Sequence, residues 1–172
     1  MGRAMVKWGT FATVLLLAGG GGAYAQAGQD RWRFTTMDDG LVTASLAAVN
    51  KLTNNSGTLS YSPVLTIACR TGGDPQWSEW LRLNDMASGS TVTVSVAIGD
   101  NQAVDERWVI SRRGKVLIKS GPQAVSRLVP ADRLALSWRF GLLSGRGEAD
   151  FDLEGIGEVV GQLAEACQTT QP

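Results

Sequence analysis

The sequence predicts a mainly β protein, an antiparallel β-sandwich or curved sheet capped by a C-terminal helix. Several short apolar segments alternate apolar and polar residues with a period of two, and turn-forming residues separate them. The last apolar segment, 156–167, instead repeats at helical spacing. A series of antiparallel strands followed by one late helix is typical of a sheet that the helix covers.

The first 25 residues have the pattern of a secretory signal peptide. A short basic region precedes an apolar stretch at 11–18, and Ala23 and Ala25 match the small residues of a cleavage site. The mature chain is expected to begin at Gln26. The sequence Ala25-Gln26-Ala27 offers a second possible cleavage pattern. The apolar stretch is far shorter than the roughly 20 residues of a membrane-spanning helix. We therefore expect a periplasmic or secreted protein with no membrane insertion after signal cleavage.

The composition of residues 26–172 favours a single domain that binds no nucleic acid. Removing residues 1–25 takes away two of the 16 basic residues and none of the 16 acidic ones, which leaves a net charge of −2. The remaining basic residues are dispersed, and Arg112-Arg113 is too short a run to form a basic patch. A chain of this length can bury a substantial core in one unit.

The first segments of the mature chain predict a hairpin and a further strand. Residues 32–37 and 41–49 are apolar-rich, and the Asp-Asp-Gly sequence between them is a strong turn signal. A loop rich in Asn, Ser and Gly follows at 54–57. Residues 63–70 then alternate and predict the next strand.

The middle of the chain predicts four more strands. Residues 77–83 follow a Gly-rich loop, and residues 91–98 show the most regular alternation in the chain. The valines and isoleucine of 91–98 share one face, which is expected to be buried. Residues 107–111 and 116–119 flank an Arg-Arg-Gly-Lys sequence, which predicts another hairpin.

The last third of the chain predicts two strands and two helices. Pro122 can occupy the first position of a short helix, and residues 133–140 return to strand. Residues 147–153 alternate between inward apolar side chains and outward acidic ones. The helix at 156–167 is expected to lay its apolar stripe on the sheet and to end at Cys167.

The two cysteines, Cys69 and Cys167, lie 98 positions apart, one near the end of a strand and one at the end of a helix. Cys69 shares a strand face with Leu65 and Ile67, so it is expected to point inward. In an exported protein an even pair of cysteines is typical of a disulfide, worth up to about 4.7 kcal/mol in the chain-entropy model. Two unrelated buried thiols are the alternative. Because neither lies in a Cys-x-x-Cys motif, an inert bond is expected rather than a redox centre.

Candidate catalytic residues are confined to carboxylates, because the chain has no histidine. This absence removes the commonest general base and every Ser-His or Cys-His pair. Glu148, Asp150 and Asp152 are the candidates for a carboxylate-dependent cell-wall hydrolase, which needs two acids in unlike environments at one cleft. Their regular spacing on one strand face is better explained by a solvated surface, so we expect no catalytic residues and no enzyme.

The same region partly matches the sequence pattern of a calcium-binding loop. Residues 150–155 place acids at alternate positions and Gly155 at the sixth. The glutamate required at the twelfth position is replaced by Gly161, and the apolar residues between the acids suit a strand that leads into a helix. The sequence therefore predicts no metal and no cofactor, and Gly155 is expected to relax the turn.

Four tryptophans, Trp77, Trp80, Trp108 and Trp138, are candidates for an aromatic platform that binds a glycan or a peptide. Residues 77 and 80 point to opposite faces of one strand, so at least one of them is expected in the core. Core packing is also the commoner role of a tryptophan whose position is unknown.

Four short motifs are spread over residues 32–168. They are Pro63-x-Leu65-x-Ile67-x-Cys69, Trp108 with Ser111, Phe151-Asp152-Leu153-x-Gly155, and Ala166-Cys167. Together they resemble the type VI secretion-associated VasI/TagO family. The resemblance implies an exported, mainly β protein that pairs Cys69 with Cys167 and has no catalytic residues. The family's remaining signature segments are replaced by Arg70-Thr71-Gly72, Val94-Ser95-Val96 and Gly141-Leu142-Leu143, as in a divergent member.

The residues and the resemblance lead to one main functional expectation. It is a non-enzymatic periplasmic accessory protein that binds another envelope protein, in a type VI secretion context. The alternative is a periplasmic inhibitor or ligand-binding module that acts on a cell-wall enzyme or glycan through an exposed aromatic side chain. The carboxylate-dependent hydrolase is the third hypothesis.

Overall fold

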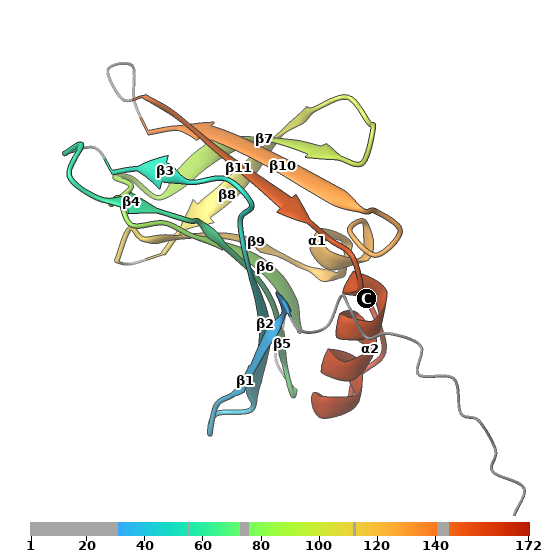
Figure 1. Cartoon of the computed structure of the whole chain (residues 1–172). Helices are drawn as coiled ribbons and strands as arrows, with labels where there is room; N and C mark the ends of the chain where they lie inside the picture. The colour runs from blue at the N-terminus through green and yellow to red at the C-terminus, as the bar shows by residue number, and fades with distance from the viewer. Residues whose placement is uncertain (1–30, 55, 73–75, 112, 141–144) are drawn as a thin grey trace, which may run out of the picture.

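The computed structural model describes residues 31–172 except 55, 73–75, 112 and 141–144 (Figure 1). The signal peptide predicted at 1–25 lies outside the described residues, as do Arg112 and the segment 141–143. The strands are β1 (Arg33–Thr36), β2 (Leu41–Ala47), β3 (Leu52–Thr53), β4 (Ser60–Tyr61), β5 (Val64–Arg70), β6 (Trp77–Arg82), β7 (Thr91–Ile98), β8 (Val104–Ile110), β9 (Val116–Ser120), β10 (Arg133–Arg139) and β11 (Arg146–Asp152). The helices are α1 (Pro122–Ser126) and α2 (Ile156–Ala166).

The protein is mainly β, as the alternating segments predict. In the part of the chain that the structure describes, nine strands form one antiparallel sheet in the order β1-β2-β5-β6-β9-β8-β7-β10-β11. The sheet is strongly curved, so that β2 and β11 approach each other although they are far apart in the strand order (Figure 1). Of the two arrangements that the sequence allows, the structure is the curved sheet with a C-terminal helix.

The two edge strands of this sheet, β1 and β11, differ in whether their outer backbone groups are hydrogen-bonded. The chain that leaves β2 passes along β11, where the Val49 N–H donates to the Asp150 carbonyl at 2.8 Å. The Asn50 side chain donates to the Glu148 carbonyl at 2.8 Å and accepts from the Asp150 N–H at 2.9 Å. These bonds occupy backbone groups along β11, whereas β1 pairs, among the described strands, with β2 alone.

The alternation predicted for the strands is confirmed by burial. Leu65, Ile67 and Cys69 of β5 are buried on the inner face, and so are the three valines of β7. In β11, Ala149 and Phe151 point into the core while the acidic residues between them face outward. The inner faces of all these strands share one hydrophobic core.

Helix α2 covers the inner face at β2 and β5. Gly155 caps its N-terminus with φ at 80°, a left-handed conformation that glycine adopts without steric cost, which confirms its expected role in the turn. The buried side chains of α2 are Ile156, Val159, Val160, Leu163 and Ala164. Cys167 caps the C-terminus, and its sulfur lies at bonding distance from that of Cys69, with 6.3 Å between the Cα atoms.

Two features of the fold differ in detail from the prediction. The loop expected around residue 54 carries the short β3–β4 hairpin, and β8 begins at Val104, three residues earlier than the alternation indicates. The short helix after Pro122 is present, with this proline at its start. Within the described ranges, no helix combines the length and apolar character needed to cross a bilayer.

Candidate binding groove

A groove of about 720 Å³ lies on the outer face of the sheet, where β1, β2, β5 and β6 run side by side. Its lining comes from alternate residues of these strands, such as Thr43 and Ser45 of β2 and Thr66 of β5. The residues between them, including Cys69, point to the opposite face, which carries α2. Neither of the two described helices covers the groove face, because α2 packs on the inner side at β2 and β5, and α1 packs on β6 next to the buried Glu79 of that same inner side.

Hydroxyl groups form the floor of the groove. Ser45 Oγ and Thr66 Oγ1 lie 2.8 Å apart across β2 and β5, and Thr43 Oγ1 donates to the Thr35 carbonyl at 3.4 Å. Thr43 and Thr66 are buried although they are polar. Because these hydroxyls bond to one another or to the backbone, they can lie buried in the floor without loss of hydrogen bonding.

Trp80 provides the apolar wall. Its side chain is half-buried, and its indole N–H donates to Ser78 Oγ at 2.8 Å. The strand register places Trp80 between Thr66 on β5 and Ile118 on β9, and Val109 on β8 continues the row. An apolar strip therefore extends from the groove across the outer face of the sheet.

The other three candidate tryptophans do not join this wall. Trp77, Trp108 and Trp138 are buried in the core, so the prediction that Trp77 or Trp80 packs in the core is confirmed. An aromatic platform made of all four is wrong, because alternation sends three of these side chains to the inner face. Trp80 alone among the four lines the groove.

Two exposed arginines flank the groove, Arg33 on β1 and Arg82 on β6. Neither makes an ion pair or a side-chain hydrogen bond with any residue that the structure describes. The two strands are separated by β2 and β5, which is a distance of about 14 Å at the usual spacing of neighbouring strands. Neither arginine was predicted from the sequence, although each lies on the same strand face as other groove residues, Arg33 with Thr35 and Arg82 with Trp80.

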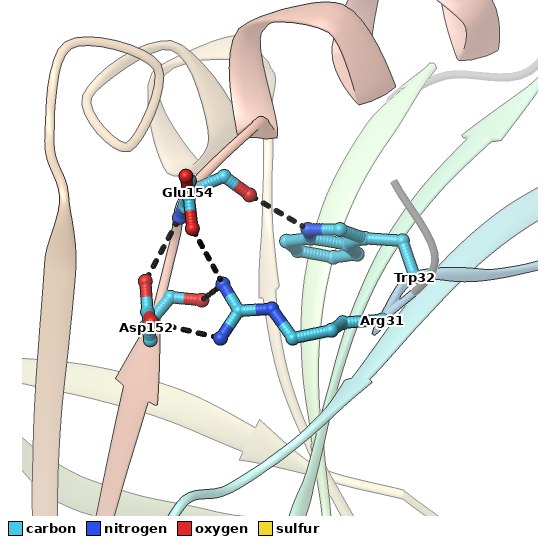
Figure 2. Close-up of polar contacts among 4 residues, drawn as sticks. All are labelled: Arg31, Trp32, Asp152 and Glu154. Atoms are coloured by element: carbon cyan, nitrogen blue, oxygen red, sulfur yellow. Dashed lines mark hydrogen bonds and ion pairs between the residues drawn. The ribbon is translucent and has the colours of Figure 1, made fainter. Parts of the chain in front are cut away.

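A third arginine, Arg31, closes one end of the groove through an ion pair with Asp152 (Figure 2). Arg31 Nη1 donates to Asp152 Oδ2 at 2.7 Å, and Arg31 Nη2 lies 3.7 Å from Glu154 Oε2. The hydrogen bond from Arg31 lowers the pKa of Asp152 below its ordinary value, and the Glu154 N–H contributes in the same direction. Asp152 is therefore ionised and already paired.

Trp32 anchors the same end of the chain. Its indole N–H donates to the Glu154 carbonyl at 3.4 Å, and its ring is buried in the core (Figure 2). Because Trp32 and Arg31 both contact the junction between β11 and α2, they fix the position at which β1 begins. The edge of the groove is thereby held by two residues that immediately precede β1.

The three carboxylates considered for a hydrolase lie along the outward side of β11. Asp152 pairs with Arg31, and Glu148 pairs with Arg146 at 3.0 Å. Asp150 is exposed, as are the side chains of its two acidic neighbours on this strand. Their positions agree with the solvated surface that the alternation indicates. Among the described residues, no group of three or more His, Cys, Asp or Glu is placed to hold a metal ion.

A partly buried ionic network, with Glu79 at its buried end, lies on the inner face and was not predicted from the sequence. Glu79 of β6 pairs with Arg127 at 2.8 Å, and Arg127 also pairs with Glu106 of β8. Lys119 Nζ of β9 lies 3.4 Å from the same Glu106. The alternation along β6 predicts the direction of this side chain. The residues two before and two after Glu79 both point inward, so Glu79 points inward as well.

Comparisons with protein-family models, with curated proteins and with solved structures found no match to this chain. The resemblance to the VasI/TagO family therefore stays a prediction from its motifs. The binding properties of the groove are therefore inferred from its own charges and hydrogen-bonding groups.

Proposed function

We propose that this chain is an exported, non-enzymatic accessory protein that binds another envelope protein through the groove. The observation that carries the proposal is the pair Arg33 and Arg82, which lack partners among the described residues and flank the groove that the half-buried Trp80 lines, on a sheet face that neither α1 nor α2 covers. Arginine and tryptophan are enriched where proteins bind one another. A groove with a half-buried aromatic side chain and two unpaired cations at its sides supplies both the apolar contact and the charge for such an interface.

The signal-peptide pattern and the motifs supply the cellular context of the proposal. The pattern at 1–25 supports export, and the resemblance to VasI/TagO proteins supports a periplasmic role in type VI secretion. A cysteine pair at bonding distance suits an oxidising compartment. Each of these points concerns where the protein acts, whereas the groove concerns what it does there.

A pair of exposed valines allows the proposal to be tested in cells. Val49 lines the groove and is 66% exposed, whereas Val104 on β8 lies outside the groove and is 62% exposed. A photo-crosslinking amino acid at position 49 is expected to yield one main covalent product with an envelope protein, identified by mass spectrometry. The same amino acid at position 104 is the control and should not yield this product.

Charge reversal at two arginines shows whether the product depends on the groove. Arg82→Glu should abolish the product formed from position 49, since it removes a flanking cation. Arg139→Glu makes the same change on an exposed residue of β10 and should leave the product intact. Equal crosslinking from positions 49 and 104, or no product from position 49, would count against a protein-binding groove.

The groove also carries an observation that favours the second candidate function. Trp80 and the hydroxyls of Ser45 and Thr66 combine a ring face with hydrogen-bonding groups, which is a combination that glycans use. A ligand-binding module of this kind would sediment with purified cell-wall sacculi, and Trp80→Ala would abolish the sedimentation. Sedimentation of the wild type without a crosslinked protein partner would replace the first proposal by this one.

A further inference from the structure

We propose that the free edge of β1 receives an extended segment of the partner protein that alternates acidic and apolar residues. This inference rests on the proposed function and specifies the partner's chemistry. The partner strand would pair with the backbone of β1, with its acidic side chains toward the groove and its apolar side chains toward Phe34. Edge strands are templates for such strand addition.

The hairpin geometry shows which backbone groups of β1 are available. The Met37 N–H donates to the Leu41 carbonyl at 2.8 Å, so these two residues form the hydrogen-bonded pair that closes the hairpin. Hydrogen-bonded and non-hydrogen-bonded pairs alternate along an antiparallel ladder. The register pairs Thr35 with Thr43 and Arg33 with Ser45, so Arg33 and Thr35 bond to β2.

Phe34 and Thr36 consequently direct their N–H and C=O groups away from β2. Nothing among the described residues pairs with this side of β1. The opposite edge strand, β11, does have hydrogen-bond partners, because Val49 and Asn50 bond to its backbone. One edge is thus covered by the chain itself and the other is left open beside the groove.

The side chains of β1 specify the pattern of the incoming strand. Arg33 and Thr35 belong to the groove face, whereas Phe34 points to the other face and remains 42% exposed. Side chains on neighbouring strands contact others on the same face of a sheet. A strand added to β1 therefore gains most from acidic residues beside Arg33 that alternate with apolar residues beside Phe34.

This end of the groove already contains an ion pair between an arginine and a carboxylate of the chain itself. Arg31 already binds Asp152, and β11 alternates acidic residues with Ala149 and Phe151. Arg31 uses its guanidinium on β11, while Arg33 and Arg82 remain without a partner in the described part of the chain. The charge that is left is positive, which favours an acidic segment.

The test uses synthetic peptides and the mature protein. The probe is a seven-residue peptide that alternates glutamate and valine, and its glutamine analogue tests the charge. Isothermal titration measures affinity, and amide chemical shifts of Phe34 and Thr36 report strand pairing. The glutamate peptide should bind and shift both amides, and Arg33→Gln should weaken it by about tenfold, the loss typical of a charge-assisted hydrogen bond. Arg139→Gln is the control and should bind as the wild type.

A proline variant tests the backbone contact. Thr36→Pro deletes an N–H that makes no bond to β2, so the fold is retained and the peptide should lose most of its affinity. Thr36→Val keeps the N–H and should retain binding. Unchanged binding to Thr36→Pro, equal binding of the glutamine analogue, or no binding of the glutamate peptide would overturn the inference.

Two further outcomes would assign the edge to another occupant. If Thr36→Pro disrupts an oligomer of the protein in sedimentation velocity, the occupant is a second copy and the inference is wrong. If uronate-containing oligosaccharides bind and the peptide does not, the groove binds a glycan. A crosslinked protein partner at position 49 without peptide binding would overturn this inference alone and leave the proposed function standing.

Discussion

Arg127, at the C-terminal end of α1, donates a hydrogen bond of 2.8 Å to Glu79, whose side chain is completely buried. Burial raises the pKa of Glu79 to about 7, against the opposing attraction of Arg127. The second carboxylate oxygen of Glu79 has no hydrogen-bond partner among the described residues. The pair therefore fastens α1 to the sheet and at the same time leaves a carboxyl group that is costly to ionise.

Stability should fall as the pH rises through the pKa of Glu79. The pKa of about 7 in the folded protein exceeds the ordinary value of 4.5, so the folded state binds this proton more tightly. The resulting stabilisation is complete below about pH 4.5 and is lost as the pH approaches 7, a change of up to about 3 kcal/mol. Urea unfolding at pH 5 and pH 8 measures it. No histidine titrates in this window, and Glu79→Gln should flatten the dependence. Identical pH profiles for the wild type and Glu79→Gln would refute the assignment.

Removing Arg127 should destabilise the protein more than removing a surface arginine. Arg127→Met leaves Glu79 buried without its cation, a loss of about 3 to 5 kcal/mol at pH 8. At pH 5 the loss should be smaller, because Glu79 is then protonated. The control is Arg133→Met, which breaks a solvent-exposed ion pair with Asp100 and should cost less than about 1 kcal/mol. Equal losses for the two variants at pH 8 would contradict the importance of the buried pair.

The pairing of Cys69 with Cys167 should account for a substantial part of the stability. Cys69→Ser removes a link between β5 and the end of α2, and the expected loss is about 2 to 5 kcal/mol with a markedly lower Tm. Cys167→Ser should match it, since either change removes the same bond. Titration of the native exported protein should find no free thiol. Two titratable thiols before reduction would show that the bond does not form.

The backbone plan of this fold follows from local sequence patterns. Residues 91–98 and 147–153 alternate so regularly that the buried side of each strand is predictable, and the burial of Val94 and Phe151 confirms it. The order of the strands in the sheet, in contrast, is not predictable from such local patterns. The contact of β6 with β9 joins residues about 40 positions apart, and no local pattern encodes that pairing. The β3–β4 hairpin has strands of two residues, too short to show a period.

The groove and the buried network were harder to predict for the same reason. Trp80 was a candidate, but its exposure depended on which face of β6 the core would cover. Arg82 lies two residues after Trp80 on β6, but Arg33 comes to the same groove only because β1, β2, β5 and β6 are neighbours in the sheet. The strand alternation predicts that Glu79 points inward. Its partner Arg127, however, lies 48 residues later, at the end of a helix. Contacts between distant segments are what the sequence pattern leaves open.

Gly147 should be intolerant of a side chain because it lies against Trp138. A Cβ atom at Gly147 would come within 2.4 Å of Trp138 Cε2, whereas one at Gly145 would meet no atom within 4 Å. Gly147→Ala is therefore expected to displace the indole and to cost about 1 to 3 kcal/mol. Gly145→Ala is the matched control and should leave the Tm nearly unchanged. Near-ultraviolet circular dichroism would report the displaced ring, and an unaltered spectrum with an unaltered Tm would contradict the close packing.

Arg31→Gln should affect the groove more than the stability of the fold. Both members of the Arg31–Asp152 pair are substantially exposed, so its loss should lower the free energy of unfolding by less than about 1 kcal/mol. The pKa of Asp152, which Arg31 lowers, should rise toward its ordinary value, as a carboxyl titration by NMR would show.

Without Arg31, Asp152 would present an unpaired negative charge at the end of the groove and repel the glutamate peptide. Arg146→Gln breaks the pair with Glu148 on the same strand and serves as the control, since neither residue lines the groove. The affinity for the peptide should fall in Arg31→Gln and remain unchanged in Arg146→Gln. An equal fall in both variants would indicate that the peptide responds to net charge and not to this position. Only a position-dependent fall agrees with an acidic strand that lies beside β1 and ends near Asp152.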